Sequence, residues 1–217
     1  MAKEKAEAKI VQLVVIKEGT FHIPATYNEW GDDENYVTFE YPIMIIGAGQ
    51  DKTTIHGGFQ IKGTKEEKKR VDMQGMTMKG SSGYGLSAFD GLSFLCKDMT
   101  FTQCRYGVLA RDTKGRLINC VITQCGYDGI FCDENALIEL EGDQTKVDGN
   151  VTSGNSSCYL LYTYDTSSTI HLLIPLTKES VSTNNHGGGN YGGHGEIAIV
   201  DDNSNKIEII NEANIIE

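Results

Sequence analysis

The stretch YGLSAFDGLSFLCKDMTFTQC, residues 84–104, is followed closely by a second copy of its pattern, YGVLARDTKGRLINCVITQC, residues 106–125. A looser third copy, YDGIFCDENALIELEGDQTKVDGN, occupies residues 127–150. In these copies a residue pair that ends in glycine recurs every 22 residues, as Tyr84-Gly85, Tyr106-Gly107 and Asp128-Gly129. Self-similarity at a fixed period predicts one structural unit stacked on copies of itself.

Apolar residues within each copy alternate with a period of two rather than 3.6. Such alternation predicts strands with one buried face, and the intervening Gly, Asn and Asp residues predict turns. Short strands at this spacing favour an all-β coil of parallel strands, with one rung of about 22 residues per repeat. The residues expected to face inward are Leu86, Ala88, Val108, Ala110, Ile130 and Cys132.

Two segments before the repeats fit the same architecture. Residues 15–21, VIKEGTF, suit a first strand and turn, and residues 42–55, PIMIIGAGQDKTTI, suit an early rung. With these segments the chain resembles, over residues 10–180, the right-handed parallel β-helix proteins of the pectin-lyase-like superfamily. The resemblance implies a single-domain right-handed parallel β-helix over residues 10–217, preceded by an N-terminal tail or capping helix at residues 1–9. It implies no particular activity, because this fold hosts many chemistries.

Length and charge exclude several classes of partner. The chain has 217 residues, enough for the core of one domain, and a formal net charge of −11. Because binding to a phosphate backbone requires a basic patch, we expect neither a nucleic acid nor an anionic membrane as partner. No stretch reaches 18 apolar residues, and the N-terminal residues lack the apolar centre of a secretory signal. A cytoplasmic or virion-associated protein is therefore favoured over a secreted one.

Six cysteines occur, and no two have the C-x-x-C spacing typical of zinc sites. Cys104 and Cys125 end the tripeptide Thr-Gln-Cys in successive copies, so the repeat stacks them. Free cysteine packs as a small hydrophobic side chain. Reduced core thiols are therefore favoured, with one or more disulfides as the alternative and zinc as the least favoured state.

Three further segments have distinctive composition. The charged run at residues 65–70 is typical of a solvated turn. The glycine-rich segment at residues 184–195 lacks the Gly-Lys-Ser/Thr ending of a phosphate-binding loop, and its two histidines, His186 and His194, are weak evidence for a metal. A coil has two open ends that must be covered, and the C-terminal segment is expected to close one end or to join a neighbouring subunit. Its alternating isoleucines are Ile197, Ile199, Ile207 and Ile209.

An acidic ladder follows from the repeat, because Asp90, Asp112 and Glu134 lie five residues past successive glycines. Equivalent positions in neighbouring rungs lie about 4.8 Å apart, and like charges at that spacing repel. Turn residues whose side chains splay into solvent or bond nearby backbone are one explanation. The other is a hard cation, most plausibly calcium, held by these three residues.

Outward-facing aromatic and charged residues form the second candidate surface. Phe89, Arg111 and Asp133 lie four residues past the glycines, where Phe89 and Arg111 fit a cation–π contact and Arg111 and Asp133 fit an ion pair. Aromatic rings beside carboxylates and amides suit sugars, which offer apolar faces and hydroxyl groups. Stacking that only fixes the register of the strands is the alternative. The candidate ligand-binding residues are Tyr84, Phe89, Tyr106, Arg111, Asp128 and Phe131.

Carboxylates and an arginine on the repeats also raise the question of catalysis. Glycoside hydrolysis needs two carboxyl groups roughly 5–10 Å apart, and the candidates to supply such a pair are Asp112, Asp128, Asp133 and Glu134. Resemblance to pectate lyases implies catalysis by a base together with bound calcium. Arg111 beside the acidic ladder resembles that arrangement. However, the tight turns of the repeats leave little room for a substrate cleft. The candidate catalytic residues are Arg111, Asp112, Asp133 and Glu134.

The sequence therefore favours a non-catalytic β-helix module that binds a polysaccharide or surface glycan, assembles as a structural homo-oligomer, or does both. The alternative is a calcium-assisted polysaccharide lyase or glycoside hydrolase that uses the acidic ladder and Arg111. A building block of a virion or cell surface is a third interpretation. No cofactor other than calcium is indicated.

Overall fold

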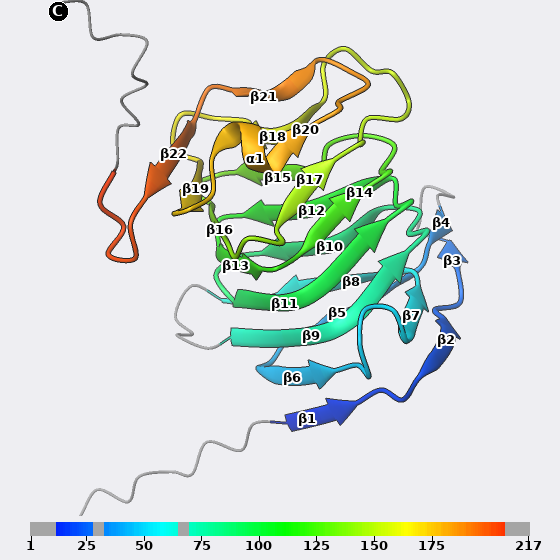
Figure 1. Ribbon diagram of the computed structural model, residues 1–217. Coiled ribbons are helices and arrows are strands. Elements are labelled where there is room, and N and C mark those ends of the chain that lie inside the picture. The colour runs from blue at the N-terminus through cyan, green and yellow to red at the C-terminus, as the bar shows by residue number, and fades with distance from the viewer. Residues whose placement is uncertain (1–11, 28–32, 65–69, 207–217) are drawn as a thin grey trace, which may run out of the picture.

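The computed structural model describes residues 12–27, 33–64 and 70–206, and these residues form β-strands with one short helix (Figure 1). A larger, 13-stranded sheet and a smaller, 7-stranded sheet contain almost all of the strands. In the described residues, the strands of these two sheets pair in parallel, as the strands at residues 70–79, 93–102 and 114–118 do. The fold is therefore all-β with long parallel sheets, an arrangement compatible with a parallel β-helix.

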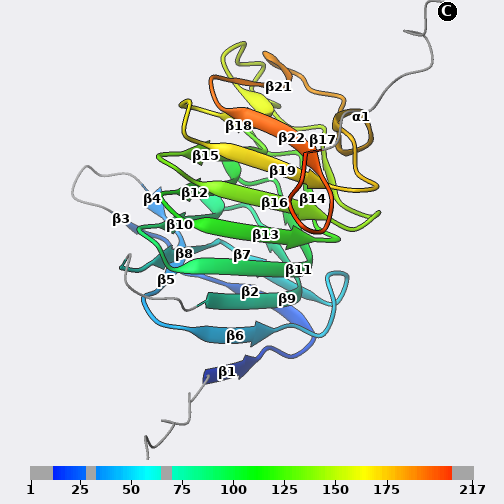
Figure 2. The same ribbon diagram turned by 90° about the vertical axis from the view of Figure 1, so that its left-hand side faces the viewer.

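The larger sheet follows the axis of the stack, and Figure 2 shows its strands lying one above another. Its main order is β1 (Gln12–Val15), β6 (Ile43–Ile46), β9 (Arg70–Lys79), β11 (Ser93–Thr102), β13 (Lys114–Ile118), β16 (Leu137–Glu141), β19 (Thr169–Leu173) and β22 (Glu196–Val200). The same sheet includes β2 (Gly19–His22), β7 (Thr53–His56), β14 (Val121–Thr123), β17 (Lys146–Asp148) and β20 (Ser182–Thr183).

The smaller sheet runs beside it in the order β21 (Gly189–Gly193), β18 (Tyr159–Thr163), β15 (Ile130–Asp133), β12 (Tyr106–Arg111), β10 (Tyr84–Phe89), β8 (Gly58–Lys62) and β5 (Tyr36–Phe39). A separate antiparallel pair consists of β3 (Thr26–Tyr27) and β4 (Asp33–Glu34). The helix α1 (Lys178–Val181) begins with a capping box in which the Thr177 side chain accepts a bond from the backbone N–H of Ser180.

The strand register confirms that positions 22 apart are vertical neighbours. Tyr84 pairs with Tyr106 and Leu86 with Val108, and Val108 pairs in turn with Ile130. The glycines form a column as well, since a Cβ added at Gly107 would lie 2.2 Å from the carbonyl oxygen of Gly129. Glycine is required there because the adjacent rung leaves no space for a side chain.

The hydrophobic core lies between the two sheets, although β10 and β12 do not follow the predicted alternation, because Ser87 and Leu109 are buried as well. The six residues expected to face inward are all buried. The larger sheet contributes stacked methionine and phenylalanine side chains, such as Met76 beside Met99 and Met78 beside Phe101. Phe94 fills the space over Gly115, whose added Cβ would lie 2.0 Å from the ring. Packing of this kind between successive rungs fixes the register of the whole stack.

The six cysteines are free and buried, which confirms their predicted packing in the core. Several other expectations fall outside the described residues: the N-terminal tail or capping helix at residues 1–9, most of the charged run at residues 65–70, and Ile207 and Ile209. Within the described ranges, no helix has the length and apolar character needed to cross a membrane.

Candidate functional site

The outward face of the smaller sheet bears a column of three tyrosines, called here the tyrosine column: Tyr84, Tyr106 and Tyr127. The ring centroids of Tyr84 and Tyr106 lie 4.8 Å apart, and those of Tyr106 and Tyr127 lie 4.9 Å apart, with interplanar angles of 25° and 23°. All three side chains are half-buried. The predicted stacking of Tyr84 on Tyr106 is therefore confirmed, and the rings stay accessible.

Arg105 packs against the tyrosine column, a contact that was not predicted from the sequence. Its guanidinium carbon lies 5.8 Å from the ring centroid of Tyr106 and 5.8 Å from that of Tyr127. The Arg105 backbone N–H donates to the carbonyl of Ser81, and its carbonyl accepts from the N–H of Tyr127. The side chain is exposed, so the cation stays available to a ligand while it contacts the rings.

A cavity of about 250 Å³ opens at the Tyr84 end of the column. Its floor belongs to β8 and β10, and its wall comes from β4, β5 and the segment before β10. Both charged and aromatic groups face it. The lining residues are Asp33, Glu34, Tyr36, Gln60, Ser82, Gly83, Tyr84, Ser87, Phe89 and Arg105.

Polar groups of the cavity wall are held by hydrogen bonds. The Tyr36 hydroxyl donates to Glu34 Oε2 over 2.8 Å, and the Ser82 hydroxyl donates to the carbonyl of Asp33 over 2.8 Å. Burial, followed by the nearby Glu34 carboxylate, raises the pKa of Tyr36. Burial also raises the pKa of Tyr84 to about 12, so its hydroxyl keeps its proton at neutral pH. These hydroxyls are therefore neutral hydrogen-bonding groups.

A second aromatic cluster continues along the same sheet beyond the column. Phe131 meets Tyr162 edge to face with ring centroids 5.2 Å apart, and it lies 5.9 Å from Tyr164. Tyr159 lies 5.1 Å from Tyr162. Phe131 was expected on this surface, whereas the three tyrosines of β18 and its following turn were not singled out. Together the column and this cluster give the smaller sheet a largely aromatic outer face.

Arg111 contacts carboxylates rather than an aromatic ring. Its Nη2 lies 2.8 Å from Asp133 Oδ2, and its Nε lies 3.8 Å from Glu134 Oε1. The predicted Arg111–Asp133 ion pair is thus confirmed. The cation–π contact expected with Phe89 is not among those found in the described residues, where Arg105 supplies the guanidinium over the tyrosine rings. Phe89 instead lines the cavity.

Asp128, one of the candidate ligand-binding residues, lies beneath the surface rather than in the column of rings. Its side chain is buried, and its Oδ1 accepts from the backbone N–H of Tyr159 over 2.7 Å. Burial raises the pKa of this carboxyl to about 6 despite that bond. Tyr127 occupies the place expected for Asp128, because the third copy contains one extra residue between Cys125 and its glycine. The 21-residue spacing of the two Thr-Gln-Cys tripeptides is the signal that would have shown this shift.

The acidic ladder has turn geometry. Asp90, Asp112 and Glu134 have φ angles of 59°, 49° and 48°, in the left-handed region that favours turns. The backbone N–H groups of Asp90 and Asp112 donate to carbonyls of the next rung, and the N–H of Glu134 donates to Asp165 Oδ2 over 2.8 Å. Within the described residues no group of three His, Cys, Asp or Glu side chains is placed to hold a metal ion. The geometry therefore gives the calcium hypothesis no support.

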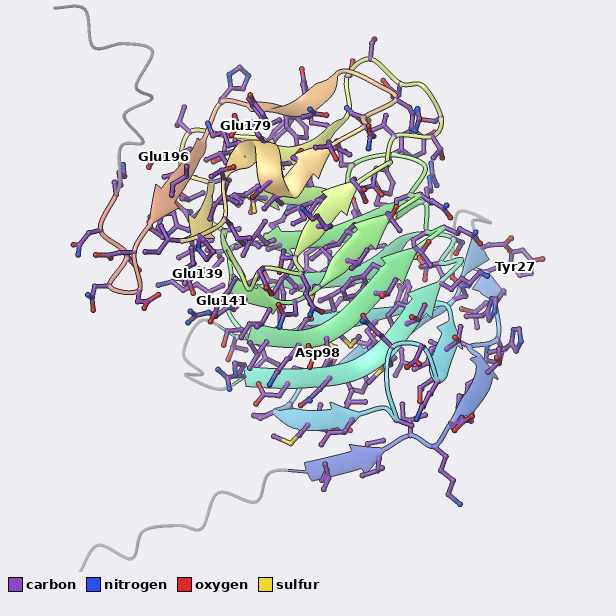
Figure 3. The ribbon with its side chains drawn as sticks, viewed as in Figure 1. Tyr27, Asp98, Glu139, Glu141, Glu179 and Glu196 are labelled. Carbon is purple, nitrogen blue, oxygen red and sulfur yellow. The ribbon has the colours of Figure 1, made fainter. Side chains whose placement is uncertain are left out.

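A second charged cluster, also missed from the sequence, lies on the larger sheet. Figure 3 shows Glu139, Glu141 and Glu196 on one side of the molecule. Arg116 Nε lies 2.8 Å from Glu141 Oε2 and 4.0 Å from Glu139 Oε2. His171 follows Glu139 in the ladder, and burial lowers its pKa. Neither the cavity of about 250 Å³ nor a second cavity of about 320 Å³ is lined by this cluster, whereas the first lies at the aromatic face, which is therefore the stronger candidate site.

Comparison with family models and curated proteins identified no relative of this chain. No protein-family model matches the chain, and no curated protein matches its sequence.

Proposed function

We propose that this chain is a right-handed parallel β-helix of the pectin-lyase-like type, organised as one domain, and that it is a non-catalytic module that binds a glycan. The observation that carries the proposal is the tyrosine column ending in a cavity that contains both aromatic and hydrogen-bonding groups. Binding sites are typically concave, with apolar surface and a few polar groups that fix orientation.

Sugar chemistry fits the two kinds of surface in the cavity. Tyr84 is the last ring of the column and lines the cavity with Phe89, so aromatic surface meets the apolar face of a pyranose ring. Gln60 and Ser87, together with the neutral Tyr36 hydroxyl, supply donors and acceptors for sugar hydroxyls. Because the rings are already stacked, little conformational entropy is lost when the ligand binds.

Charge selects among glycans. Two carboxylates, Asp33 and Glu34, line the cavity beside one guanidinium, that of Arg105, and the whole chain carries a net charge of −11. A polyanionic chain of uronates would meet repulsion over most of its length. A neutral glycan is therefore the proposed ligand.

Two observations favour binding over catalysis. Arg111, the candidate cation of a lyase, is held by the carboxylate of Asp133, whose side chain is only 6% exposed. Asp112 and Glu134 belong to turns rather than to the cavity. The alternative, a calcium-assisted lyase or a glycoside hydrolase, predicts shortened products from polyuronates or neutral glycans in the presence of calcium, and complete absence of products would reject it.

The test is a binding titration with neutral hexasaccharides of glucose, mannose and N-acetylglucosamine, and with hexagalacturonate. We expect at least one neutral hexasaccharide to bind, and the double variant Tyr84→Ala, Phe89→Ala to weaken its binding about tenfold, since each aromatic contact contributes roughly 0.5–1.5 kcal/mol. The matched control is Tyr41→Ala, which removes an exposed tyrosine that does not line the cavity. Equal affinities of the double variant and the control would refute the site.

A further inference from the structure

A second cavity, lined almost entirely by apolar side chains, lies where the stack begins, and we call it the N-terminal pocket. Its volume is about 320 Å³. Three of its residues belong to the outermost strands and are well exposed for apolar side chains: Val14 at 42%, Phe21 at 42% and Val37 at 40%. The described residues that line it are Val14, Ile16, Phe21, His22, Ile23, Val37, Phe39, Ile45, Ile55 and Phe59.

Strand edges surround this pocket. In the described part of the chain β1 pairs only with β6, β2 only with β7 and β5 only with β8. With respect to the other described strands, each of these three therefore presents an outer edge of backbone N–H and C=O groups at the same end of the stack. Open edges next to apolar surface are a template for an added strand. The pocket and the edges together form a site for an apolar, extended segment.

The chain contains one segment outside the described residues with the composition that such a site requires. Residues 207–217, IEIINEANIIE, include five isoleucines, and Ile207 and Ile209 alternate with Glu208. The other terminal segment, residues 1–11, has the sequence MAKEKAEAKIV, in which five of eleven residues are charged and, apart from Met1, only the last two are large and apolar. Charged side chains do not fill an apolar cavity without a large desolvation cost. The isoleucine-rich segment is therefore the better match.

Distance decides which copy of the chain supplies this segment. It follows Lys206, which bridges to Val200 of β22 at the far end of the larger sheet. Seven strand spacings of about 4.8 Å, roughly 34 Å, separate β22 from β1. A fully extended chain advances at most about 3.3–3.6 Å per residue, so eleven residues would bring only their last members to the pocket of their own copy. The first isoleucines can enter only the pocket of a neighbour.

We propose that residues 207–217 of one copy dock into the N-terminal pocket of a second copy, adding a strand to its open edge and inserting isoleucine side chains among Val14, Phe21 and Val37. The contact is head-to-tail, so each copy offers one pocket and one segment. Contacts of this type form open chains unless the geometry closes a ring. This inference concerns assembly and does not rest on the proposed glycan site, which lies on the outer face of the smaller sheet.

The test uses two full-length variants whose defects are complementary. The pocket variant, Phe21→Asp, keeps residues 207–217 intact, and the segment variant, Ile207→Asp with Ile209→Asp, keeps the pocket intact. In sedimentation velocity, the unmodified protein is expected to grow in mass with concentration, whereas each variant alone stays a monomer. An equimolar mixture of the two variants is expected to form a heterodimer of twice the monomer mass, because one intact pocket meets one intact segment.

A peptide of residues 207–217 gives a second readout that does not depend on the pocket variant. It is expected to bind the segment variant, whose pocket is free, and to lose at least tenfold in affinity when the peptide carries the same two aspartates. Circular dichroism verifies that both variants are folded. An unmodified protein that stays monomeric in sedimentation velocity at all concentrations overturns the proposal. So does a segment variant that self-associates as strongly as the unmodified protein, which would indicate that two identical pockets meet end to end.

Discussion

Gly107→Ala tests the glycine column, because the added methyl group would point directly at the next rung. The new Cβ would lie 2.2 Å from the carbonyl oxygen of Gly129 and 2.5 Å from Cγ2 of Ile122. A real Cβ does not approach so closely, and the Gly129 carbonyl cannot rotate away, since it accepts a hydrogen bond of 2.8 Å from the N–H of Val108. The strain must therefore separate two rungs.

The expected cost of Gly107→Ala is at the upper end of the range for overpacking, about 3 kcal/mol. For a chain of this length, that corresponds to a decrease in Tm of roughly 6–12 °C. The assay is thermal and urea unfolding followed by far-UV circular dichroism. Gly83→Ala is the matched control, because a Cβ added there meets no atom within 4 Å, and it should change stability by less than about 1 kcal/mol. A Gly107→Ala protein as stable as the Gly83→Ala protein would refute the stacking of these rungs.

Three further predictions concern charged and titratable groups. Arg111→Met is expected to cost roughly 1–3 kcal/mol in urea unfolding, because it leaves the buried Asp133 carboxylate without its cation; Asp133→Asn should restore part of that stability in the double variant. Burial holds the pKa of Asp128 at about 6 in the folded chain, above its unfolded value, so the free energy of unfolding should fall as pH rises from about 4 to 6; Asp128→Asn should flatten that slope, and an unchanged profile would contradict it. Burial, followed by the neighbouring His22 and then Lys79, lowers the pKa of His56. The free energy of unfolding should therefore fall as pH drops through the unfolded histidine value near 6.5. In His56→Gln the fall should be smaller, and an equal fall in both proteins would refute it.

The repeat predicted the fold well where each rung copies the one before it. Leu86, Val108 and Ile130 occupy one vertical row, because the 22-residue period places each of them at the same register position of its strand. The same reasoning placed Arg111 beside Asp133, and the structure confirms their contact. Backbone pairing alone determines these neighbours, so a fixed period in the sequence was sufficient to find them.

The site was predicted less completely for two physical reasons. One extra residue before Gly129 moved Tyr127 into the tyrosine column and turned Asp128 toward the interior, where it bonds the Tyr159 backbone. The cavity depends on Asp33, Glu34 and Tyr36, which precede the repeats and have no counterpart in them. The repeat predicts only the residues that recur from rung to rung. This cavity forms where a non-repeating segment meets the first regular rungs, so the repeat could not predict it.

The most direct test of the proposed function is isothermal titration of the folded protein with the neutral hexasaccharide that it binds most tightly. The aromatic face predicts saturable binding to one site, about tenfold weaker affinity for Tyr84→Ala, Phe89→Ala, and unchanged affinity for Tyr41→Ala. Absence of binding by every neutral hexasaccharide, or equal affinity in all three proteins, would contradict the assignment of a glycan to the tyrosine column and its cavity.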